Sequence, residues 1–240
     1  MTPQPLILAE RDAPFWGFGE VFLMVAVFLL ALGFVIGTAT HFLHKDAELG
    51  VWAVAEEFAA YLILFGALKL VFAWQKKPLL RSLGWVPQPF GVTSLLAVGF
   101  ALFLISVTLQ IVLRTPDTET PFQKLLEGGL VSRIAIALFG VSIGPMIEEL
   151  LFRGFLQPVL MNATGVFPGI LLTSILFGAL HLSQNANMWQ VAVLITIAGF
   201  GFGVVRHVSG STRASTISHV AYNALPCFVT LFQGVYPNHQ

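Results

Sequence analysis

The sequence predicts an all-α protein, a polytopic transmembrane helical bundle of about seven spans. Of its 240 residues, 56% are hydrophobic and only 10% are charged, and the mean hydropathy is +0.83. A soluble domain carries roughly 25% charged residues, so this chain has too few charges for a polar exterior and we expect the lipid bilayer to be its solvent. Basic and acidic residues balance at 12 each, which gives no reason to expect nucleic acid as a partner.

Seven apolar segments predict the spans. They lie near residues 15–40, 49–74, 91–113, 130–160, 167–184, 189–208 and 212–232. Most reach the ~20 residues that cross ~30 Å of hydrocarbon, and helices are expected because lipid offers the backbone no hydrogen-bond partner. The fifth segment is short and the fourth is long, which predicts tilt or a break there. We expect residues 1–240 to form one membrane domain.

Basic residues in the loops predict the orientation. Lys76, Lys77 and Arg81 lie in the connection after the second segment, and Arg206 and Arg213 in the connection at the end of the sixth. The positive-inside rule places both loops in the cytoplasm. The other side carries Arg114, Lys124 and Arg133, diluted by Asp117, Glu119 and Glu127. We therefore expect an integral, multi-pass protein of a bacterial inner membrane with a cytoplasmic N-terminus.

Three charges stand within the fourth segment, where each costs a few kcal/mol at the bilayer centre. Glu149 and Arg153 are four residues apart and can pair on one helix face. Glu148 then points about 100° around the helix, and a carboxylate placed in this way suits general-base work on water. Pro145 precedes the pair and predicts a kink that opens room for water.

Other interpretations of these carboxylates stay open. The Glu149–Arg153 pair fits a buried ion-pair network that only locks helices together. The pair Glu56–Glu57 stands near the start of the second segment and has no arginine four residues on. We expect it to be solvated at the membrane interface, with no catalytic role.

Two histidines lie well inside apolar segments. His181 follows Phe177 by four residues, and His219 precedes Asn223 by four, so the members of each pair share a helix face. An imidazole and an amide on one face can stabilise a developing oxyanion. The alternatives are that they satisfy each other or bond across helices as structural contacts.

These fragments together resemble the CPBP family of intramembrane proteases, which includes type II CAAX prenyl endopeptidases and bacteriocin-processing or immunity relatives. The family pattern is Glu-Glu-x-x-x-Arg, then Phe-x-x-x-His, then His-x-x-x-Asn/Asp, each on its own span. Here it is Glu148-Glu149-x-x-x-Arg153, Phe177-x-x-x-His181 and His219-x-x-x-Asn223. The resemblance covers residues 130–230, which it implies to be a catalytic core of four spans.

The resemblance also implies roles for these residues. Glu148 and His181 would activate a water for attack on a peptide bond, and His219 with Asn223 would stabilise the oxyanion. Glu149, Arg153 and Phe177 would support the site.

Metal dependence is an open point of the resemblance, because the family has been described both as metal-dependent and as glutamate-based. Glu148, His181 and His219 could supply the three protein ligands of a zinc ion, although the HExxH helix is absent. No other cofactor is expected, and a glutamate-activated water is the favoured interpretation.

One spacing argument opposes convergence of the histidines. If the fifth and seventh segments are parallel, His181 lies ~14 residues past its segment start and His219 only ~7. At 1.5 Å per residue, this predicts a depth offset of ~10 Å.

The favoured function is an intramembrane endopeptidase that cuts a membrane-associated or lipidated, CAAX-like substrate. Its partner would be a peptide or protein with a membrane-embedded or prenylated C-terminus, met in the lipid bilayer. Two alternatives belong to other classes: a proton-linked transporter, since intramembrane Glu, His and Arg are typical of proton relays, and a non-catalytic bacteriocin-immunity or binding protein.

Overall fold

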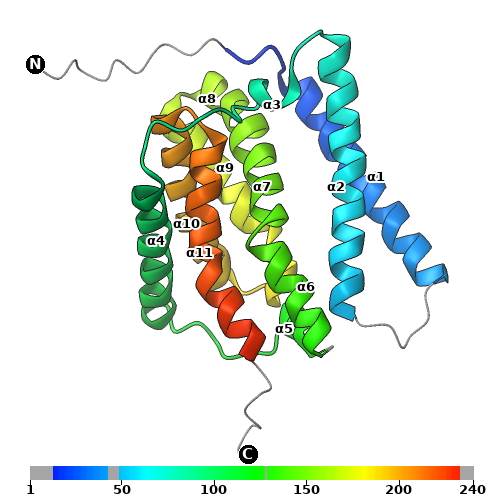
Figure 1. Ribbon diagram of the computed structural model, residues 1–240, viewed down its shortest axis with the longest axis vertical. Helices are drawn as coiled ribbons and strands as arrows, with labels where there is room; N and C mark the ends of the chain where they lie inside the picture. The colour runs from blue at the N-terminus through cyan, green and yellow to red at the C-terminus, as the bar shows by residue number, and fades with distance from the viewer. Residues whose placement is uncertain (1–12, 43–48, 128, 233–240) are drawn as a thin grey trace, which may run out of the picture.

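The computed structural model describes residues 13–42, 49–127 and 129–232, and the regular structure in these ranges is helical (Figure 1). In chain order the elements are α1 (Phe18–Phe42), α2 (Leu49–Trp74), α3 (Leu79–Ser82), α4 (Val92–Val112), α5 (Pro121–Leu126), α6 (Leu130–Gly140), α7 (Ile143–Glu149), η1 (Leu150–Leu156), α8 (Gln157–Thr164), α9 (Val166–Leu180), η2 (Ser183–Asn185), α10 (Trp189–Ser209) and α11 (Thr212–Phe232). Helices α1 and α2 form a pair at one side, and α2 contacts the remaining bundle mainly through α6. The predicted all-helical bundle is confirmed.

Within the described residues, five helices rather than seven are long and apolar enough to cross a membrane. They are Phe18–Gly37, Gly50–Trp74, Val92–Val112, Leu130–Thr164 and Trp189–Ser209. The predicted fifth segment, 167–184, is the shorter apolar helix α9, which ends at Leu180. The predicted seventh segment forms α11, but buried polar side chains such as Thr212 and Ser215 occupy its first half and lower its hydropathy.

The long fourth segment is broken, as its length predicts. Helix α6 ends at Gly140, and α7 begins at Ile143 after a turn at Val141 and Ser142. The break lies before Pro145 and not at it, because Pro145 is the third residue of α7, where a helix has no internal partner for the missing N–H. After Glu149 the chain continues as the π-helix η1, a form that recurs at functional sites.

Backbone contacts hold the first turn of α11 against the linker between α3 and α4. The Thr212 amide donates to the Gly84 carbonyl at 2.9 Å, and the Thr212 hydroxyl donates to the Leu83 carbonyl at 3.2 Å. One turn further, the Ser218 hydroxyl donates to the Leu95 carbonyl of α4 at 2.9 Å. These bonds satisfy the polar groups of α11 inside the bundle and fix the position of the residue that follows Ser218.

The segment before α1 is attached to η1. The indole N–H of Trp16 donates to the Phe155 carbonyl at 2.9 Å, and the two rings stack with centroids 5.7 Å apart. Phe72 of α2 and Leu83 belong to the same buried cluster. A π-helix pairs its backbone carbonyls with different amides from those of an α-helix, so some carbonyls need partners outside the helix. Trp16 provides such a donor for Phe155 and thereby attaches the start of α1 to η1.

Candidate active site

The four residues predicted to be catalytic line one cavity of about 550 Å³. Glu148 comes from α7, His181 from the residue that ends α9, and His219 and Asn223 from α11. Helices α2, α5, α6 and α10 provide further walls. Three motifs that are separated in sequence therefore meet around a single space large enough to receive part of a peptide.

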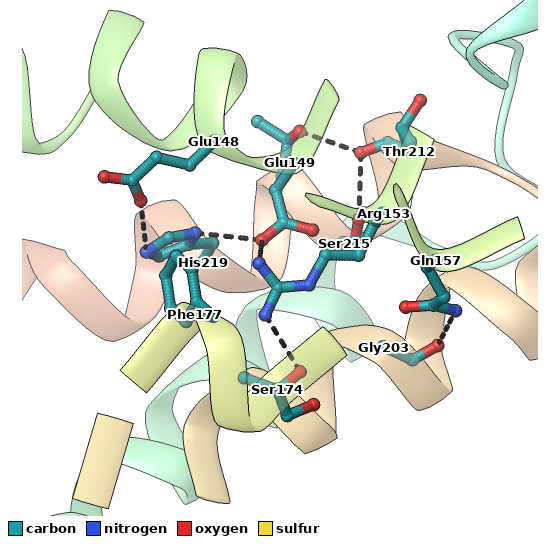
Figure 2. Close-up of polar contacts among 12 residues, drawn as sticks. Glu148, Glu149, Arg153, Gln157, Ser174, Phe177, Gly203, Thr212, Ser215 and His219 are labelled. Carbon is teal, nitrogen blue, oxygen red and sulfur yellow. Dashed lines mark hydrogen bonds and ion pairs between the residues drawn. The ribbon is translucent and has the colours of Figure 1, made fainter. Parts of the chain in front are cut away.

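The imidazole of His219 lies between the two adjacent glutamates (Figure 2). Its Nδ1 is 3.0 Å from Oε1 of Glu149, and its Nε2 is 3.6 Å from Oε2 of Glu148. The side chain of Glu149 is fully buried, whereas 18% of the Glu148 side chain is exposed. Glu148 is thus the member of the pair that reaches the cavity, as the 100° rotation between neighbouring helical residues predicts.

The predicted Glu149–Arg153 ion pair is present and completely buried. Nη1 of Arg153 is 3.0 Å from Oε1 of Glu149, and neither side chain has any exposure. Nη2 of Arg153 donates to the Gly199 carbonyl of α10 at 2.9 Å (Figure 2). A buried charge is tolerated only where partners surround it, and Arg153 has them from two helices.

Phe177 touches every charged or imidazole group of the site except the glutamates. The Arg153 guanidinium lies 4.4 Å from its ring centroid, in cation–π contact. The ring centroids of His181 and His219 lie 4.8 and 5.8 Å away. Because one side chain contacts both imidazoles, the depth offset predicted from helix register does not separate the two histidines.

The tautomer of His181 follows from its local contact. Nδ1 lies 2.8 Å from the Phe177 carbonyl, an acceptor, so Nδ1 carries a proton and donates it. In the neutral ring, Nε2 then holds the lone pair. A ring nitrogen able to accept a proton is therefore available in a residue that lines the cavity.

Asn223 does not form a contiguous pair with His219. Its Nδ2 donates to the Gly140 carbonyl at 2.9 Å, at the C-terminal end of α6. An amide nitrogen has two hydrogens, so this bond leaves a second donor on a residue that lines the cavity. The imidazole and the amide, which were expected to act together on one helix face, therefore have different partners: the glutamates for His219, and the end of α6 for Asn223.

Comparison with known proteins identifies the second half of the chain. Residues 130–225 match the family model described as Type II CAAX prenyl endopeptidase Rce1-like. Over these residues the chain is similar to an Rce1-like domain. This result confirms the predicted resemblance over these residues and indicates, at the level of the family, a CAAX-type protease.

One relative matches most of the chain, but its description gives no activity. A protein of Bacillus subtilis (strain 168), described as the uncharacterized protein YyaK, is 28% identical over 205 residues. The match covers 82% of this chain and 62% of that relative, so the chain spans less than two-thirds of its length. No solved structure matches the chain significantly.

A further ionisable side chain of the cavity lies outside residues 130–225, which match the family model. Glu57 of α2 lines the cavity and interacts electrostatically with both His181 and Glu148. The expectation that the Glu56–Glu57 pair is only solvated interface is therefore wrong for Glu57. No local signal in the sequence shows this position, since the four-residue spacing of Glu57 and Tyr61 predicts only their own contact, in which the Tyr61 hydroxyl donates to Glu57 at 2.9 Å.

The arrangement does not fit the zinc site that the family resemblance raised. Among the described residues, no group of three His, Cys, Asp or Glu side chains is placed to hold a metal ion. Of the suggested ligands, Glu148 and His219 face each other, with His219 held on its other nitrogen by Glu149, and Nδ1 of His181 is taken by the Phe177 carbonyl. We therefore derive no step through a metal.

Proposed function

We propose that this protein is an intramembrane endopeptidase that hydrolyses a peptide bond of a membrane-associated or lipidated, CAAX-like substrate with water activated by Glu148. The observation that carries the proposal is the contact of partly exposed Glu148 with His219 in a cavity that His181 also lines. A transporter needs a pathway for its substrate through the membrane. A binding protein needs no proton acceptor in its binding cavity. An acid and two imidazoles around one cavity are instead the groups that hydrolysis requires.

The proposed reaction begins with a water held between Glu148 and His181. The carboxylate accepts a proton as the water oxygen bonds to the carbonyl carbon of the peptide, and the carbonyl oxygen becomes an oxyanion. The second amide hydrogen of Asn223 and a protonated His219 can donate to that oxyanion. The carbon–nitrogen bond then breaks, and the proton held by Glu148 passes to the leaving amine, so acid and amine products balance one water.

His219 and Glu149 act in this scheme through position. Glu149 accepts from Nδ1 of His219, which turns Nε2 toward Glu148 and the cavity. Arg153 in turn holds Glu149. We assign Glu149, Arg153 and Phe177 to positioning, because each is buried and contacts other residues of the site.

The decisive experiment is cleavage of membrane-anchored peptides by purified protein in lipid vesicles. Glu148→Gln is expected to lower the rate by at least about 10²-fold, the usual contribution of a general base, while leaving the thermal unfolding transition in place. Glu56→Gln, which changes the neighbour of a lining residue but not the cavity, is the matched control and should retain activity. Full activity of Glu148→Gln would overturn the mechanism.

We further propose that the N-terminus is cytoplasmic and that the cavity is reached from the opposite face. The loop between α2 and α3, which carries Lys76 and Lys77, and the first turn of α11, which carries Arg213, lie at the end of the bundle near α3 and α8 (Figure 1). Helix α5 and the C-terminal end of α11 lie at the other end (Figure 1). The cavity lining includes α5 and η2. The positive-inside rule supports a cytoplasmic location for the basic end.

Single-cysteine labelling in intact cells tests this orientation. In a Cys227→Ala background, Gln184→Cys should react with a membrane-impermeant maleimide from outside, whereas Lys76→Cys should react only after the cells are permeabilised. The reverse pattern would place the cavity mouth in the cytoplasm and overturn the proposed orientation without affecting the proposed chemistry.

A further inference from the structure

The cavity wall has acidic side chains but no lysine or arginine among the described residues that line it. Of the described residues that line it, two are carboxylic acids, Glu57 and Glu148, and none is lysine or arginine. Arg153, the nearest strong cation of the site, is buried behind Glu149 and Phe177 and has no exposure. A group that enters the cavity therefore meets two carboxylic acids and, among the described lining residues, no lysine or arginine side chain.

Glu57 is held in this place by the α1–α2 pair. The Tyr61 hydroxyl donates to Oε1 of Glu57 at 2.9 Å. The Tyr61 ring is 7% exposed and stacks on Phe28 of α1, with centroids 5.9 Å apart. A carboxylate fixed by a buried tyrosine is a preorganised acceptor, because little side-chain freedom remains to be lost when a ligand binds.

Glu57 belongs to a different part of the molecule from the hydrolytic groups. It comes from α2, outside residues 130–225 that match the protease family. It lines the same cavity as Glu148 and His181. Its position is that of a group which contacts the substrate beside the reacting bond rather than one that transfers the proton.

We propose that Glu57 is a specificity residue that selects a peptide with a lysine or arginine side chain close to the bond that is cut. This inference rests on the proposed peptidase function. An ammonium or guanidinium group pairs with Glu57 in a partly desolvated space, where charge-assisted hydrogen bonds are strong. A carboxylate in the same place is repelled by two acids, a like-charge contact that costs several kcal/mol at interfaces.

The size of the cavity limits where the cation stands in the substrate. A volume of about 550 Å³ has an edge on the order of 8 Å, which an extended chain crosses in about two or three residues. The basic residue is therefore within about three positions of the scissile bond.

The test uses quenched-fluorescent peptides with one hydrophobic anchor and a common sequence, in which Lys, Gln or Glu is placed in turn at each position near the cleaved bond. For the wild-type protein in lipid vesicles, we expect kcat/KM for the Lys peptide to exceed that for the Glu peptide by about tenfold or more at one position. Glu57→Gln should bring this ratio toward one, mainly through KM, and Glu57→Lys should reverse it. Glu56→Gln, the matched control, should keep the wild-type ratio.

The outcomes separate the two proposals. Equal kcat/KM for Lys, Gln and Glu peptides at all positions, with Glu148→Gln inactive, overturns the role of Glu57 and leaves the peptidase standing. The wild-type comparison alone decides this even where a Glu57 variant fails to fold. Rates for the wild type that equal those of Glu148→Gln overturn the proposed function. In that case, binding of the peptides to Glu148→Gln, measured by fluorescence anisotropy, tests charge selection without turnover. Equal affinity for the Lys and Glu peptides would then overturn the proposed role of Glu57 too.

Discussion

Oε1 of Glu149 is shared by two partners, since Nδ1 of His219 and Nη1 of Arg153 each lie 3.0 Å from it. The same oxygen therefore neutralises a buried arginine and orients the imidazole that faces Glu148. Stability and geometry of the site are linked through this one atom.

Replacing Glu149 alone is expected to lower the stability of the protein and to disturb the geometry of the site. Glu149→Gln leaves Arg153 charged and buried without a carboxylate, a change that typically costs about 3–5 kcal/mol of unfolding free energy. It also leaves Nδ1 of His219 with a neutral amide oxygen, for which Arg153 competes, in place of the carboxylate. The imidazole then loses its fixed orientation, so peptide cleavage should be lost. Denaturant-induced unfolding in detergent micelles and the vesicle cleavage assay measure the two effects.

The double variant Glu149→Gln, Arg153→Leu is the control for this prediction. Without the arginine no uncompensated charge remains, so much of the lost unfolding free energy should return while cleavage stays absent. A Glu149→Gln protein as stable as the wild type would show that Arg153 does not depend on the carboxylate.

Phe177→Leu is expected to weaken the site without removing a charged group. It deletes the ring that the Arg153 guanidinium contacts at 4.4 Å, an interaction worth about 1–2 kcal/mol when desolvated, and it removes the surface against which both imidazoles pack. We expect lower thermal stability and a fall in kcat larger than the change in KM. Phe167→Leu on the same helix, where the side chain is 64% exposed, is the control and should have little effect on either.

Asn223→Ala tests a residue whose partner is backbone. The substitution leaves the half-buried Gly140 carbonyl without the donor it has at 2.9 Å, which costs at most the roughly 1–3 kcal/mol of a fully buried unsatisfied acceptor. It also removes the second amide hydrogen proposed to face the oxyanion, so kcat should fall beyond what the stability loss explains. Unchanged kcat in a destabilised but folded variant would restrict Asn223 to holding the end of α6.

The sequence-level prediction succeeds where the decisive relationship is local. The pairing of Glu149 with Arg153 and the separate direction of Glu148 follow from helix geometry within one segment, and the structure shows both. A break in the fourth segment also follows from its length. Its exact place does not follow from the sequence: the break lies at Val141 and Ser142, and Pro145 occupies the first turn of the helix after it.

The prediction fails where the relationship depends on how helices pack. The spacing of Glu57 and Tyr61 gives no hint that α2 faces His181, which only the contact of α2 with α6 determines. Similarly, hydropathy predicts an apolar seventh span, whereas Thr212 and Ser218 are satisfied by carbonyls from a distant linker and from α4. Partners far apart in sequence allow a polar helix to be buried.

Gly99 of α4 is the last position at which the fold predicts an effect on the site. A Cβ built there meets the Ser218 carbonyl and then the Ala221 side chain at 2.7 Å, so α4 and α11 can pack this closely only because Gly99 has no side chain. Gly99→Ala must push α11 away or shift α4. Such overpacking typically costs about 1–3 kcal/mol, and a displacement of about 1 Å of His219, the next residue after Ser218, can lower the rate by about 10²-fold.

Gly66→Ala is the matched control for this substitution, because no atom lies within 4 Å of a Cβ added at Gly66 of α2. Alanine is favoured over glycine in a helix by about 1 kcal/mol, so this variant should be at least as stable as the wild type and equally active. Thermal unfolding and cleavage rates measured side by side distinguish a packing effect from a general effect of glycine replacement. If Gly99→Ala behaves like Gly66→Ala, then the close approach of α4 to Ser218 does not hold His219 in register with Glu148.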